Sequence, residues 1–497
     1  MSGNFSGSGF DLQPSAQQVP MQTNYITNFD FLNQYLPDTY EKEFERYGNR
    51  TISSFLRMVG AELPSNSDLV KWAEQGRLHV KYSQVGTAAT ANASEAIFQV
   101  NDPAAPTGVT TTGQVPFSAT GGIAIREGQT VVIAQNDASG ENKGIVSSVD
   151  LTASPIQFTV AFYEAGGLVT SGTGVGNSDV TVFIYGSEFK KGTTGMDGSL
   201  ESDDYIFENS PIILKDKYEV SGSDMAQIGW VEVTTENGAT GYLWYMKSEH
   251  ETRLRFDDYL ETSMVEAVPA VAPTTPIGGQ SNAQQLGFKG SEGVFYSVSE
   301  RGNLWTGGVP NALSDFDTII GRLDSQGAIE ENVLFLDRAF GFAIDDMLAA
   351  QNSYGAGGTS YGLFDNDEEM ALNLGFSGFR RGYDFYKTDW KYLNDPTMRG
   401  GLTRGAINVG GSGAINGLMV PAGSTTVYDQ VLGKNAKRPF LHVRYRASET
   451  EDRRYKTWIT GSAGGAATSD LDAMQVNYLS ERCICTMGAN NFVLFED

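Results

Sequence analysis

The chain has 497 residues, and its 60 Asp and Glu side chains outnumber 35 Lys and Arg, which gives a net charge of −25. A protein that coats nucleic acid by neutralising phosphates needs a basic excess, so the composition disfavours that class. Hydrophobic residues make up 40% of the chain, charged residues make up 19%, and the 58 glycines indicate many turns. This length allows about two to five structural units with a large buried core. The composition therefore predicts a folded, loop-rich protein that contains β-structure.

Cysteine and histidine are scarce, since the thiols are Cys483 and Cys485 and the imidazoles are His79, His250 and His442. These numbers exclude a disulfide-stapled scaffold and leave too few ligands for a zinc site. We expect two reduced thiols in the core on one strand, because residues two apart on a strand are poorly placed to bridge each other. The sequence predicts no cofactor, no metal, no signal peptide and no membrane-spanning segment.

The first 36 residues are low in charge and carry spaced aromatic residues. A fully disordered tail holds fewer aromatics, so we expect an extended arm that becomes ordered against another surface. Pro37 and Asp38 then begin a helical stretch, and the arm with this first helix spans 1–60. Within 61–82, Ser67 as an N-cap predicts a short linker helix.

The composition changes near residue 81. Between 81 and 180, Gly, Ser and Thr supply 34 of 100 residues, with 8 acidic and 3 basic side chains. Turn residues separate short β-branched runs, which lie at 122–125, 130–134, 156–163 and 180–185. This pattern is typical of an all-β sandwich or barrel. We therefore expect an inserted β domain at 83–195 that folds as a unit with its ends close together.

Two long elements follow the β domain. Residues 205–233 predict a two-stranded ribbon without a core of its own, which needs support because such ribbons are marginal in water. On this ribbon, Tyr218 and Trp230 are predicted to contact a neighbouring subunit. Residues 240–267 predict a long, mostly polar helix whose apolar residues recur four apart.

An α/β region comes next. Residues 313–323 carry apolar side chains at helical spacing, and Ser314 with Asp317 has capping-box spacing. Residues 332–337 predict a buried strand, and Asp337 is expected to cap the helix after it.

One string matches a catalytic motif. Residues 358–362 fit G-x-S-x-G, in which Ser360 would be the nucleophile, and Asp384 or Asp389 with His442 would complete a triad. That motif needs a strand before it and a helix after it, whereas here a helix precedes and a Gly-rich loop follows. The acidic run at 365–369 lacks the glycine and terminal Glu of an EF-hand loop, which favours a solvated turn. The sequence therefore predicts that the chain is not an enzyme.

Between 375 and 460, basic residues outnumber acidic ones by 14 to 7, and aromatic residues lie among them. Proteins that bind single-stranded nucleic acid share this composition. Subunit interfaces are also enriched in Arg and aromatic residues. The overall acidic charge favours subunit contacts. The predicted interface residues in this half are Arg380, Arg381, Tyr386, Trp390, Arg444 and Arg454.

The order of aromatic arm, β ribbon, long helix, α/β region and terminal β pair resembles the major capsid protein of tailed bacteriophages, the Hong Kong 97-type fold. Residues 414–423, AINGLMVPAG, are similar to the family's axial-domain strand, and the ending CICTMGANNFVLF resembles its final strand, turn and strand. With its inserted β domain the chain looks most like those of crAss-like bacteriophages. The resemblance implies an E-loop at 196–239, a P domain with spine helix at 240–330, an A domain at 331–440, and a return to the P domain with a terminal β hairpin at 441–497.

This resemblance implies an α+β structural subunit that forms hexamers and pentamers of an icosahedral virion shell around double-stranded DNA, assembled in the bacterial host cytoplasm. It implies a separate scaffolding protein, a portal and decoration proteins as partners, weak non-specific contact with DNA, and no membrane. An acidic subunit suits a shell past which DNA must be packed and ejected. The alternatives are another β-rich virion protein, a surface adhesin or decoration protein, or a serine hydrolase that uses Ser360.

Overall fold

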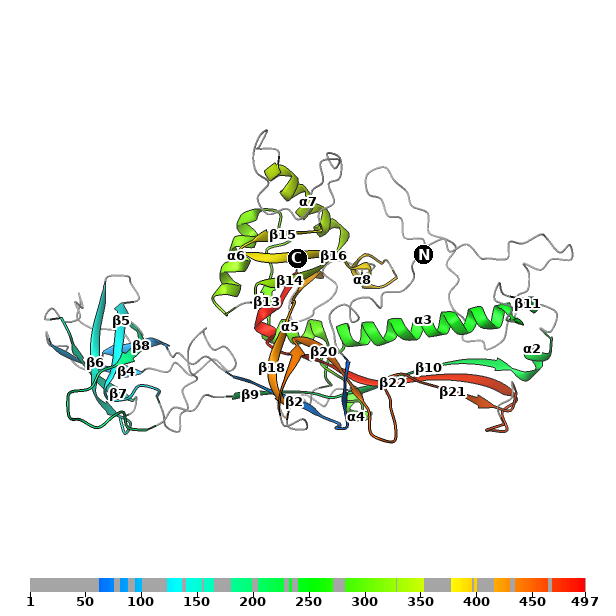
Figure 1. Ribbon diagram of the computed structural model, residues 1–497, viewed down its shortest axis with the longest axis horizontal. Helices are drawn as coiled ribbons and strands as arrows, with labels where there is room; N and C mark the ends of the chain where they lie inside the picture. The colour runs from blue at the N-terminus through cyan, green and yellow to red at the C-terminus, as the bar shows by residue number, and fades with distance from the viewer. Residues whose placement is uncertain are drawn as a thin grey trace. The chain divides into compact units, whose positions relative to one another are not determined.

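The computed structural model divides into two compact units, which are described separately (Figure 1). Unit 2 is Lys71–Phe207, and unit 1 contains the chain up to Val70 and Glu208–Asp497. The structure describes residues 62–75, 81–87, 94–100, 123–135, 140–153, 156–164, 180–198, 204–227, 232–234, 240–270, 282–327, 329–352, 377–395, 397–399, 415–429, 434–463 and 467–496. The arm and first helix expected at 1–60 lie outside these residues.

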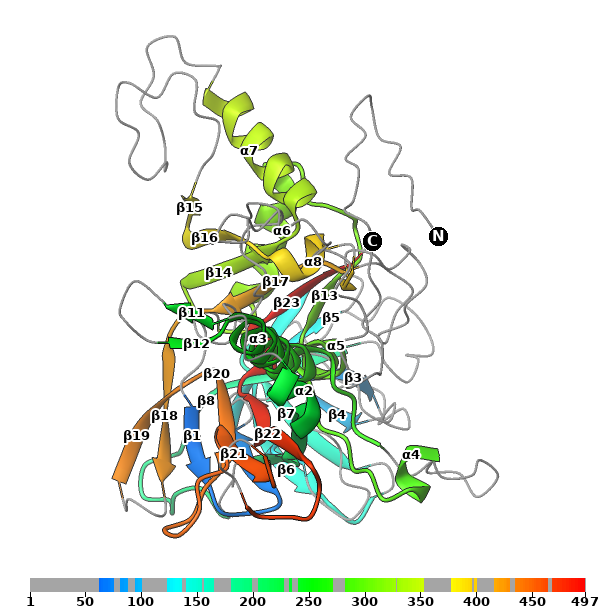
Figure 2. The same ribbon diagram turned by 90° about the vertical axis from the view of Figure 1, so that its right-hand side faces the viewer.

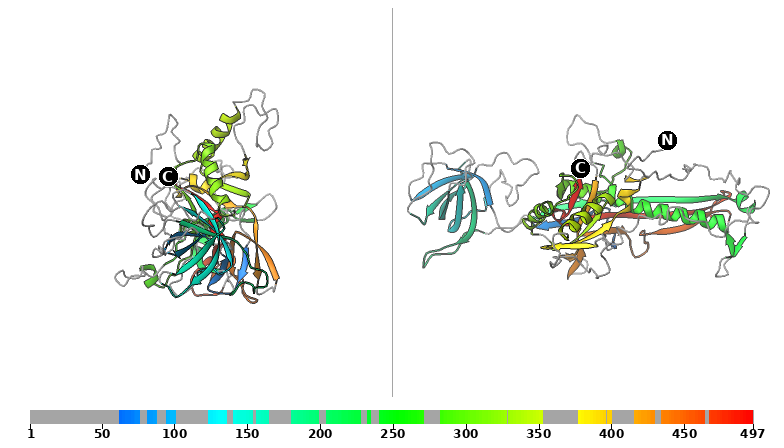
Figure 3. Two further views of the ribbon diagram at one scale, coloured as in Figure 1. Left: turned by 90° about the vertical axis from the view of Figure 1, so that its left-hand side faces the viewer. Right: turned by 90° about the horizontal axis from the view of Figure 1, so that it is seen from above.

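Unit 2 contains a closed, six-stranded antiparallel barrel in the order β3-β4-β7-β6-β5-β8 (Figure 3). Its interior is filled by alternate side chains such as Val131, Phe158 and Val182, each at most 1% exposed. Small β-branched and aromatic residues at alternate positions suit a barrel interior. The strands are β3 Lys81–Thr87, β4 Glu95–Val100, β5 Gln129–Gln135, β6 Glu141–Asp150, β7 Gln157–Phe162 and β8 Val180–Ser187.

The chain enters and leaves the barrel through a two-stranded ribbon formed by β2, Val70–Gln75, and β9, Asp204–Asn209. Unit 2 is therefore wider than the 83–195 that composition predicts. The linker helix expected from Ser67 is wrong. Residues of β2 alternate in exposure, because pairing with β9 sends successive side chains to opposite faces.

Unit 1 contains a five-stranded sheet around the long central strand β22, Ala473–Thr486. The helix expected at 240–267 is present as α3, Leu243–Glu266, which lies along this sheet (Figures 1 and 2). Phe256 and Leu260 of α3 pack against apolar residues of β22. The other strands are β1 Glu62–Ser65, β10 Ile212–Ser221, β20 Leu441–Arg446 and β21 Lys456–Gly461.

The ribbon expected at 205–233 is wrong in its pairing. Strand β10 pairs along its length with β22, not with residues 225–233. Val220 is 2% exposed, and Leu214 and Tyr218 are partly buried against the cluster under α3, so β10 has a core to join. The intervening elements are α2 Gly222–Gln227 and the paired strands β11 Glu232–Thr234 and β12 Thr240–Tyr242.

A second, mixed sheet has the order β13-β23-β17-β14-β16-β15. Helices α6, Leu313–Asp324, and α7, Arg338–Asn352, pack on one face. The opposite face shares one cluster with α5, Val294–Arg301, and with strands β20 and β22, which joins the two sheets. The strands are β13 Asn303–Trp305, β14 Glu331–Leu336, β15 Gly378–Arg381, β16 Tyr383–Asp389, β17 Ile415–Pro421 and β23 Val493–Glu496. The remaining elements are α4 Asn282–Gln285, α8 Lys391–Asn394, η2 Ala489–Asn491 and the paired strands β18 Ser424–Asp429 and β19 Lys434–Pro439.

The expected cap of α7 is confirmed, because the backbone N–H of Phe340 donates to the Asp337 carboxylate at 2.6 Å. The expected cap of α6 is wrong. The Asp315 carboxylate, not the pair at Ser314 and Asp317, accepts from the backbone N–H of Ala312 at 3.2 Å. The helix begins at Leu313, so its N-cap is Ala312, which precedes the expected Ser314 by two positions.

The terminal β hairpin is also wrong. Strand β22 pairs with β10, β20 and β21, whereas β23 pairs with β13 and β17 in the other sheet. Between them Gly488 adopts φ +60° and begins the short turn η2, which redirects the chain. Glycine tolerates this left-handed conformation without a Cβ penalty. The last two strands therefore link the two sheets of unit 1.

Candidate functional site

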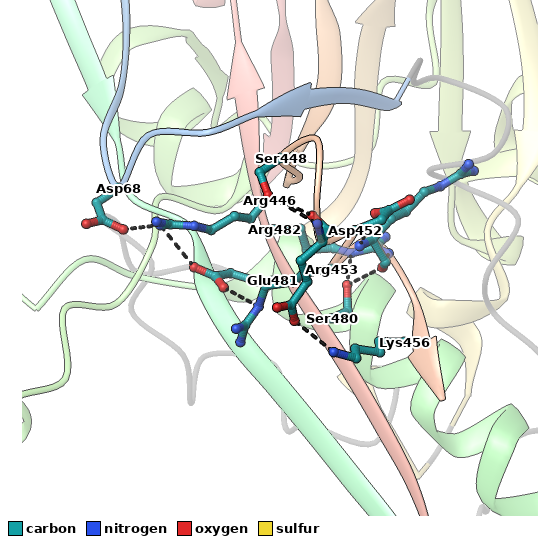
Figure 4. A network of polar contacts seen from close by, with 11 residues as sticks. Asp68, Arg446, Ser448, Asp452, Arg453, Lys456, Ser480, Glu481 and Arg482 are labelled. Carbon is teal, nitrogen blue, oxygen red and sulfur yellow. Dashed lines mark hydrogen bonds and ion pairs between the residues drawn. The ribbon is translucent and has the colours of Figure 1, made fainter. Parts of the chain in front are cut away.

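A network of arginines and carboxylates connects β1 and the loop after it to β20 and β22 (Figure 4). Glu481 on β22 is only 6% exposed. Its carboxylate lies 2.8 Å from Arg453 Nε and 3.5 Å from Arg446, which also pairs with Asp68. The Arg446 guanidinium, by hydrogen bonding and charge, holds the pKa of Asp68 below its usual value. Arg446 thus connects the loop after β1 to Glu481 on β22.

The second half of the network surrounds Arg482, which is 5% exposed. Its guanidinium donates to Ser480 Oγ and to the Arg454 carbonyl oxygen, both at 2.8 Å. It also lies 3.3 Å from Glu62 on β1, and Glu62 pairs with Arg454 as well. Burial lowers the pKa of Arg482, and the Glu62 carboxylate opposes that shift. A buried guanidinium needs such a counter-ion, because uncompensated buried charge is costly.

This network binds parts of the chain to one another. The segment 62–68 is anchored to strands that lie 380 to 420 positions later, and β1 runs parallel to β20 from Glu62↔Val443 to Ser65↔Arg446. Its carboxylates are each matched to an arginine. The arrangement therefore clamps the segment that leads into β2.

The clamp includes two of the predicted interface residues, Arg444 and Arg454. Arg444 donates to the Pro64 carbonyl oxygen at 3.3 Å, and Arg454 pairs with Glu62 and lies over the Tyr445 ring at 5.8 Å. Sequence reasoning missed the acidic members of the network. The one available signal was the charged pair at 481–482 inside an otherwise uncharged strand.

The other predicted interface residues divide among different environments. Arg380 and Arg381 are exposed on β15 and pair with Asp384 and Asp317. Tyr386 lies on the adjacent strand and is 41% exposed. Tyr218 packs partly buried under α3, and Trp230 lies outside the described residues.

Trp390, which was predicted to contact another subunit, lies in the core of the single chain and leaves little surface for such a contact. It is 2% exposed and packs among Phe295, Phe335 and Tyr392, with ring centroids 5.4–5.9 Å away. The aromatic residues that composition placed beside arginines are partly core residues. Sequence composition cannot separate the two roles, because large aromatics serve both.

Among the described residues, the catalytic triad that the serine hydrolase alternative requires is not assembled. Ser360 lies outside them. Asp384 and Asp389 both lie on β16, where Asp384 pairs with Arg380 and Asp389 pairs with Arg338. His442 lies on β20 in the other sheet and is 2% exposed. His442 Nδ1 lies 3.1 Å from the Pro439 carbonyl oxygen.

Two buried, free thiols, Cys483 and Cys485, lie on β22, which confirms that expectation. Within the described part of the chain, no group of three or more His, Cys, Asp or Glu is placed to bind a metal. The acidic run at 365–369 lies outside that part. No described helix has the length and apolar character needed to span a membrane.

A shallow depression lies where β14 and β16 end and α7 begins, lined by residues that include Phe342 and Thr388. Four of its charged groups form two ion pairs, as Lys387 Nζ lies 2.5 Å from Asp345 and Arg338 pairs with Asp389, and the Asp337 carboxylate accepts the Phe340 backbone N–H. The depression therefore offers no unpaired catalytic group.

No family model matches the chain, and no curated protein is similar to it. Among solved structures, the chain is similar to one from Microbacterium phage Oxtober96, with 8% identity and a TM-score of 0.36 over 92% of this chain and 95% of that one. It is similar to a chain from the capsid of a native GTA particle, with 8% identity and a TM-score of 0.36 over 95% and 99%. It is also similar to a chain from the capsid of Cyanophage P-SCSP1u, with 10% identity and a TM-score of 0.34 over 63% and 80%. Because these identities and TM-scores are low, the function of the chain is inferred from its own structural features.

Proposed function

We propose that the chain is a shell-forming subunit, the major capsid protein of a tailed bacteriophage with the Hong Kong 97-type fold. The observation that carries this proposal is the β2–β9 ribbon. In the described part of the chain it has two strands, and Ile206 and Tyr205 on β9 are 68% and 41% exposed. A two-stranded ribbon is marginal alone in water, and exposed apolar residues gain free energy when another surface covers them. A neighbouring copy of the chain would provide that surface.

Open strand edges in unit 1 support the same proposal. Among the described residues, strand β21 pairs with β22 and with no other strand, and its Trp458 and Ile459 are 36% and 48% exposed. Strand β10 forms another edge, where Ile213 is 52% exposed. Exposed edges with apolar side chains invite pairing with other chains. A subunit that contacts many neighbours in a closed shell has a use for several such surfaces.

In this proposal the β2–β9 ribbon is the E-loop. The segment first expected to fill it, 196–239, includes β10, which is part of the main sheet. The ribbon leads into the barrel, so the inserted domain is carried at the end of the E-loop. The clamp formed by Glu62, Asp68, Glu481 and the arginines around them fixes the base of this ribbon.

The proposal includes the assembly and the partners that the family resemblance implies. The subunits would form hexamers and pentamers, with a separate scaffolding protein, a portal and decoration proteins as partners. The protein would reside in the virion after assembly in the bacterial cytoplasm. Arg380, Arg381 and Tyr386 are proposed to contact another subunit from the edge formed by β15 and β16. A crAss-like origin stays an expectation from sequence that no comparison supports.

Expression of the full chain with and without a scaffolding protein, followed by electron microscopy, tests the function. A shell protein gives closed particles, whereas an adhesin gives trimers or fibres. The variant Ile206→Lys places a charge on the ribbon and should stop assembly while leaving a soluble subunit. Leu151→Lys, at a 56% exposed position on the barrel, is the matched control and should assemble as wild type does. Normal shells from the Ile206 variant would contradict the role of the ribbon.

A further inference from the structure

Asn209 lies at the point where the chain leaves the β2–β9 ribbon and enters the main sheet of unit 1. It is the last residue of β9, which pairs with β2, and three residues later the chain begins β10, which pairs with β22. The Asn209 residue is only 4% exposed. Burying a polar amide is costly unless its donors and its acceptor are hydrogen-bonded, so the partners of Asn209 show what this position requires.

The Asn209 side chain uses both of its donor hydrogens and its acceptor oxygen. Nδ2 donates to the Ile484 carbonyl oxygen on β22 at 2.7 Å and to the Glu292 carbonyl oxygen at 2.9 Å. Oδ1 accepts from the Ser210 backbone N–H at 2.8 Å, from the Glu292 backbone N–H at 2.9 Å and from the Ser291 hydroxyl at 3.0 Å. Backbone carbonyls only accept and backbone N–H groups only donate, so these partners fix the orientation of the amide.

Other side chains at position 209 cannot make this set of bonds. A carboxylate keeps the acceptor and loses both donors, and an apolar side chain loses all five bonds. Gln carries the same amide on a side chain that is one methylene longer, in a site with little room to adjust. Removing one partner of a buried hydrogen bond costs more than the average bond contributes, because the other partner stays desolvated. The site therefore selects Asn.

These bonds join three segments of unit 1, which are the end of β9, the loop before α5 and the strand β22. Ile484 is 1% exposed and belongs to the core cluster that joins the two sheets. The carboxylate of Glu292 lies 3.1 Å from Arg301 on α5, so the loop that Asn209 binds is itself attached to a helix. Asn209 is thus bonded to the rigid part of unit 1.

Both strands of the ribbon are attached to unit 1 at their base. The clamp holds the segment that leads into β2, since Asp68 pairs with Arg446, and Asn209 holds the end of β9. A binding element that is held in place before its partner arrives loses less conformational entropy on association. We propose that Asn209 is a positioning residue for shell assembly, which holds the base of the ribbon so that the ribbon can contact a neighbouring copy. This inference rests on the proposed shell function.

Amide hydrogen exchange of the free, full-length subunit and its assembly with a scaffolding protein test the proposal together. Asn209→Ala should accelerate exchange at the end of β9 and the start of β10 at least about tenfold, which corresponds to about 1.4 kcal/mol. The yield of closed particles should fall at least about tenfold, while the amides of α3 and of the barrel stay protected because the subunit remains folded.

Two serine variants grade this effect. Ser291→Ala removes one of the five bonds, so its changes in exchange and in yield should be smaller than those of Asn209→Ala. Ser210→Ala is the matched control, because it keeps the backbone N–H that donates to Asn209, and it should exchange and assemble as wild type does.

The variant Asn209→Asp separates lost hydrogen bonds from lost packing. Its carboxylate keeps the acceptor and loses both donors, whereas the protonated carboxyl regains one O–H donor. Its excess of exchange over wild type, compared at the same pH, should therefore shrink as the pH falls. The excess of Asn209→Ala should not change in this way, because alanine has no group to protonate.

Unchanged exchange in Asn209→Ala overturns the proposal, as does faster exchange with a normal yield of particles. An excess of exchange in Asn209→Asp that is independent of pH also overturns it. If the wild type forms no particles, the shell function is wrong and the role of Asn209 in assembly is wrong with it. The exchange of the free subunit then shows separately whether Asn209 anchors β9.

Discussion

Removing the charge of Glu62 tests the clamp at the base of the β2–β9 ribbon. The Glu62 carboxylate lies 3.3 Å from the buried Arg482 guanidinium and also pairs with Arg454. Glu62→Gln keeps the shape of the side chain and removes its negative charge. Arg482 then keeps two neutral hydrogen-bond acceptors, Ser480 Oγ and the Arg454 carbonyl oxygen, and loses its carboxylate partner.

The expected cost follows from the exposure of the three side chains. Breaking a fully buried ion pair from one side costs about 3–5 kcal/mol. The Arg482 side chain is 6% exposed, but those of Glu62 and Arg454 are 27% and 55% exposed, so water screens part of the interaction. We therefore expect the anchoring of β1 to lose about 2 kcal/mol, which is about a 30-fold increase in local opening.

Amide hydrogen exchange of β1 and β20, followed by mass spectrometry, measures this opening directly. Glu62→Gln should accelerate exchange in Glu62–Ser65 and in the paired strand by about 30-fold, while the barrel strands stay unchanged. Glu451→Gln is the matched control, since its 2.8 Å pair with Lys456 joins two half-exposed side chains, and it should exchange as wild type does. Equal exchange in both variants would refute the reasoning that a buried arginine depends on Glu62.

Three further predictions concern unit 1. Phe256→Ala removes a fully buried ring under α3 and should lower the free energy of unfolding by about 3–5 kcal/mol in urea titrations, whereas Tyr259→Ala, at a 47% exposed position on the same helix, should change it by less than about 0.5 kcal/mol. Gly461→Ala places a Cβ 1.8 Å from a carbonyl oxygen at φ +130° and should lower the free energy of unfolding by more than about 1 kcal/mol. Gly321→Ala, which has open space around it in α6, should raise the free energy of unfolding by about 0.5–1 kcal/mol. An unchanged stability of the Gly461→Ala variant would contradict the local geometry. Glu496 is 3% exposed, and burial raises the pKa of its carboxyl above 4.5. The stability that the protonated carboxyl contributes is therefore fully present below the pKa of the unfolded chain and is lost as pH rises through the pKa of the folded protein. Glu496→Gln should stabilise the protein at neutral pH and remove that part of the pH dependence, and a wild-type stability that stays constant above pH 4.5 would contradict this.

The elements that the sequence predicted well have a pattern set by their own residues. The strand at Glu331–Leu336, the Asp337 cap and the helix with Phe256 and Leu260 follow from local burial periodicity and capping chemistry. The β-branched runs at 130–134, 156–163 and 180–185 likewise indicated the barrel strands β5, β7 and β8, whereas the run at 122–125 forms no strand in its described residues 123–125. In each case the decisive interactions lie within one element or between neighbours along the chain.

The failed predictions depend on distant partners. Strand β10 was expected to pair with the next segment, but its partner β22 lies more than 250 positions later. Strands β22 and β23 follow one another closely and nevertheless enter different sheets. Glu62 of the clamp had no local signal, because it meets Arg482 only through the parallel pairing of β1 with β20. A residue pattern indicates that a segment forms a strand, whereas the packing of the whole fold determines which strand it pairs with.

The most direct test of the shell function is a cryo-electron microscopy reconstruction of particles formed by the full chain with a scaffolding protein. We predict closed icosahedral particles in which the ribbon of β2 and β9 lies across an adjacent subunit and covers Tyr205 and Ile206. Trimers, fibres or monomers under all assembly conditions would contradict the proposal that this chain builds a capsid.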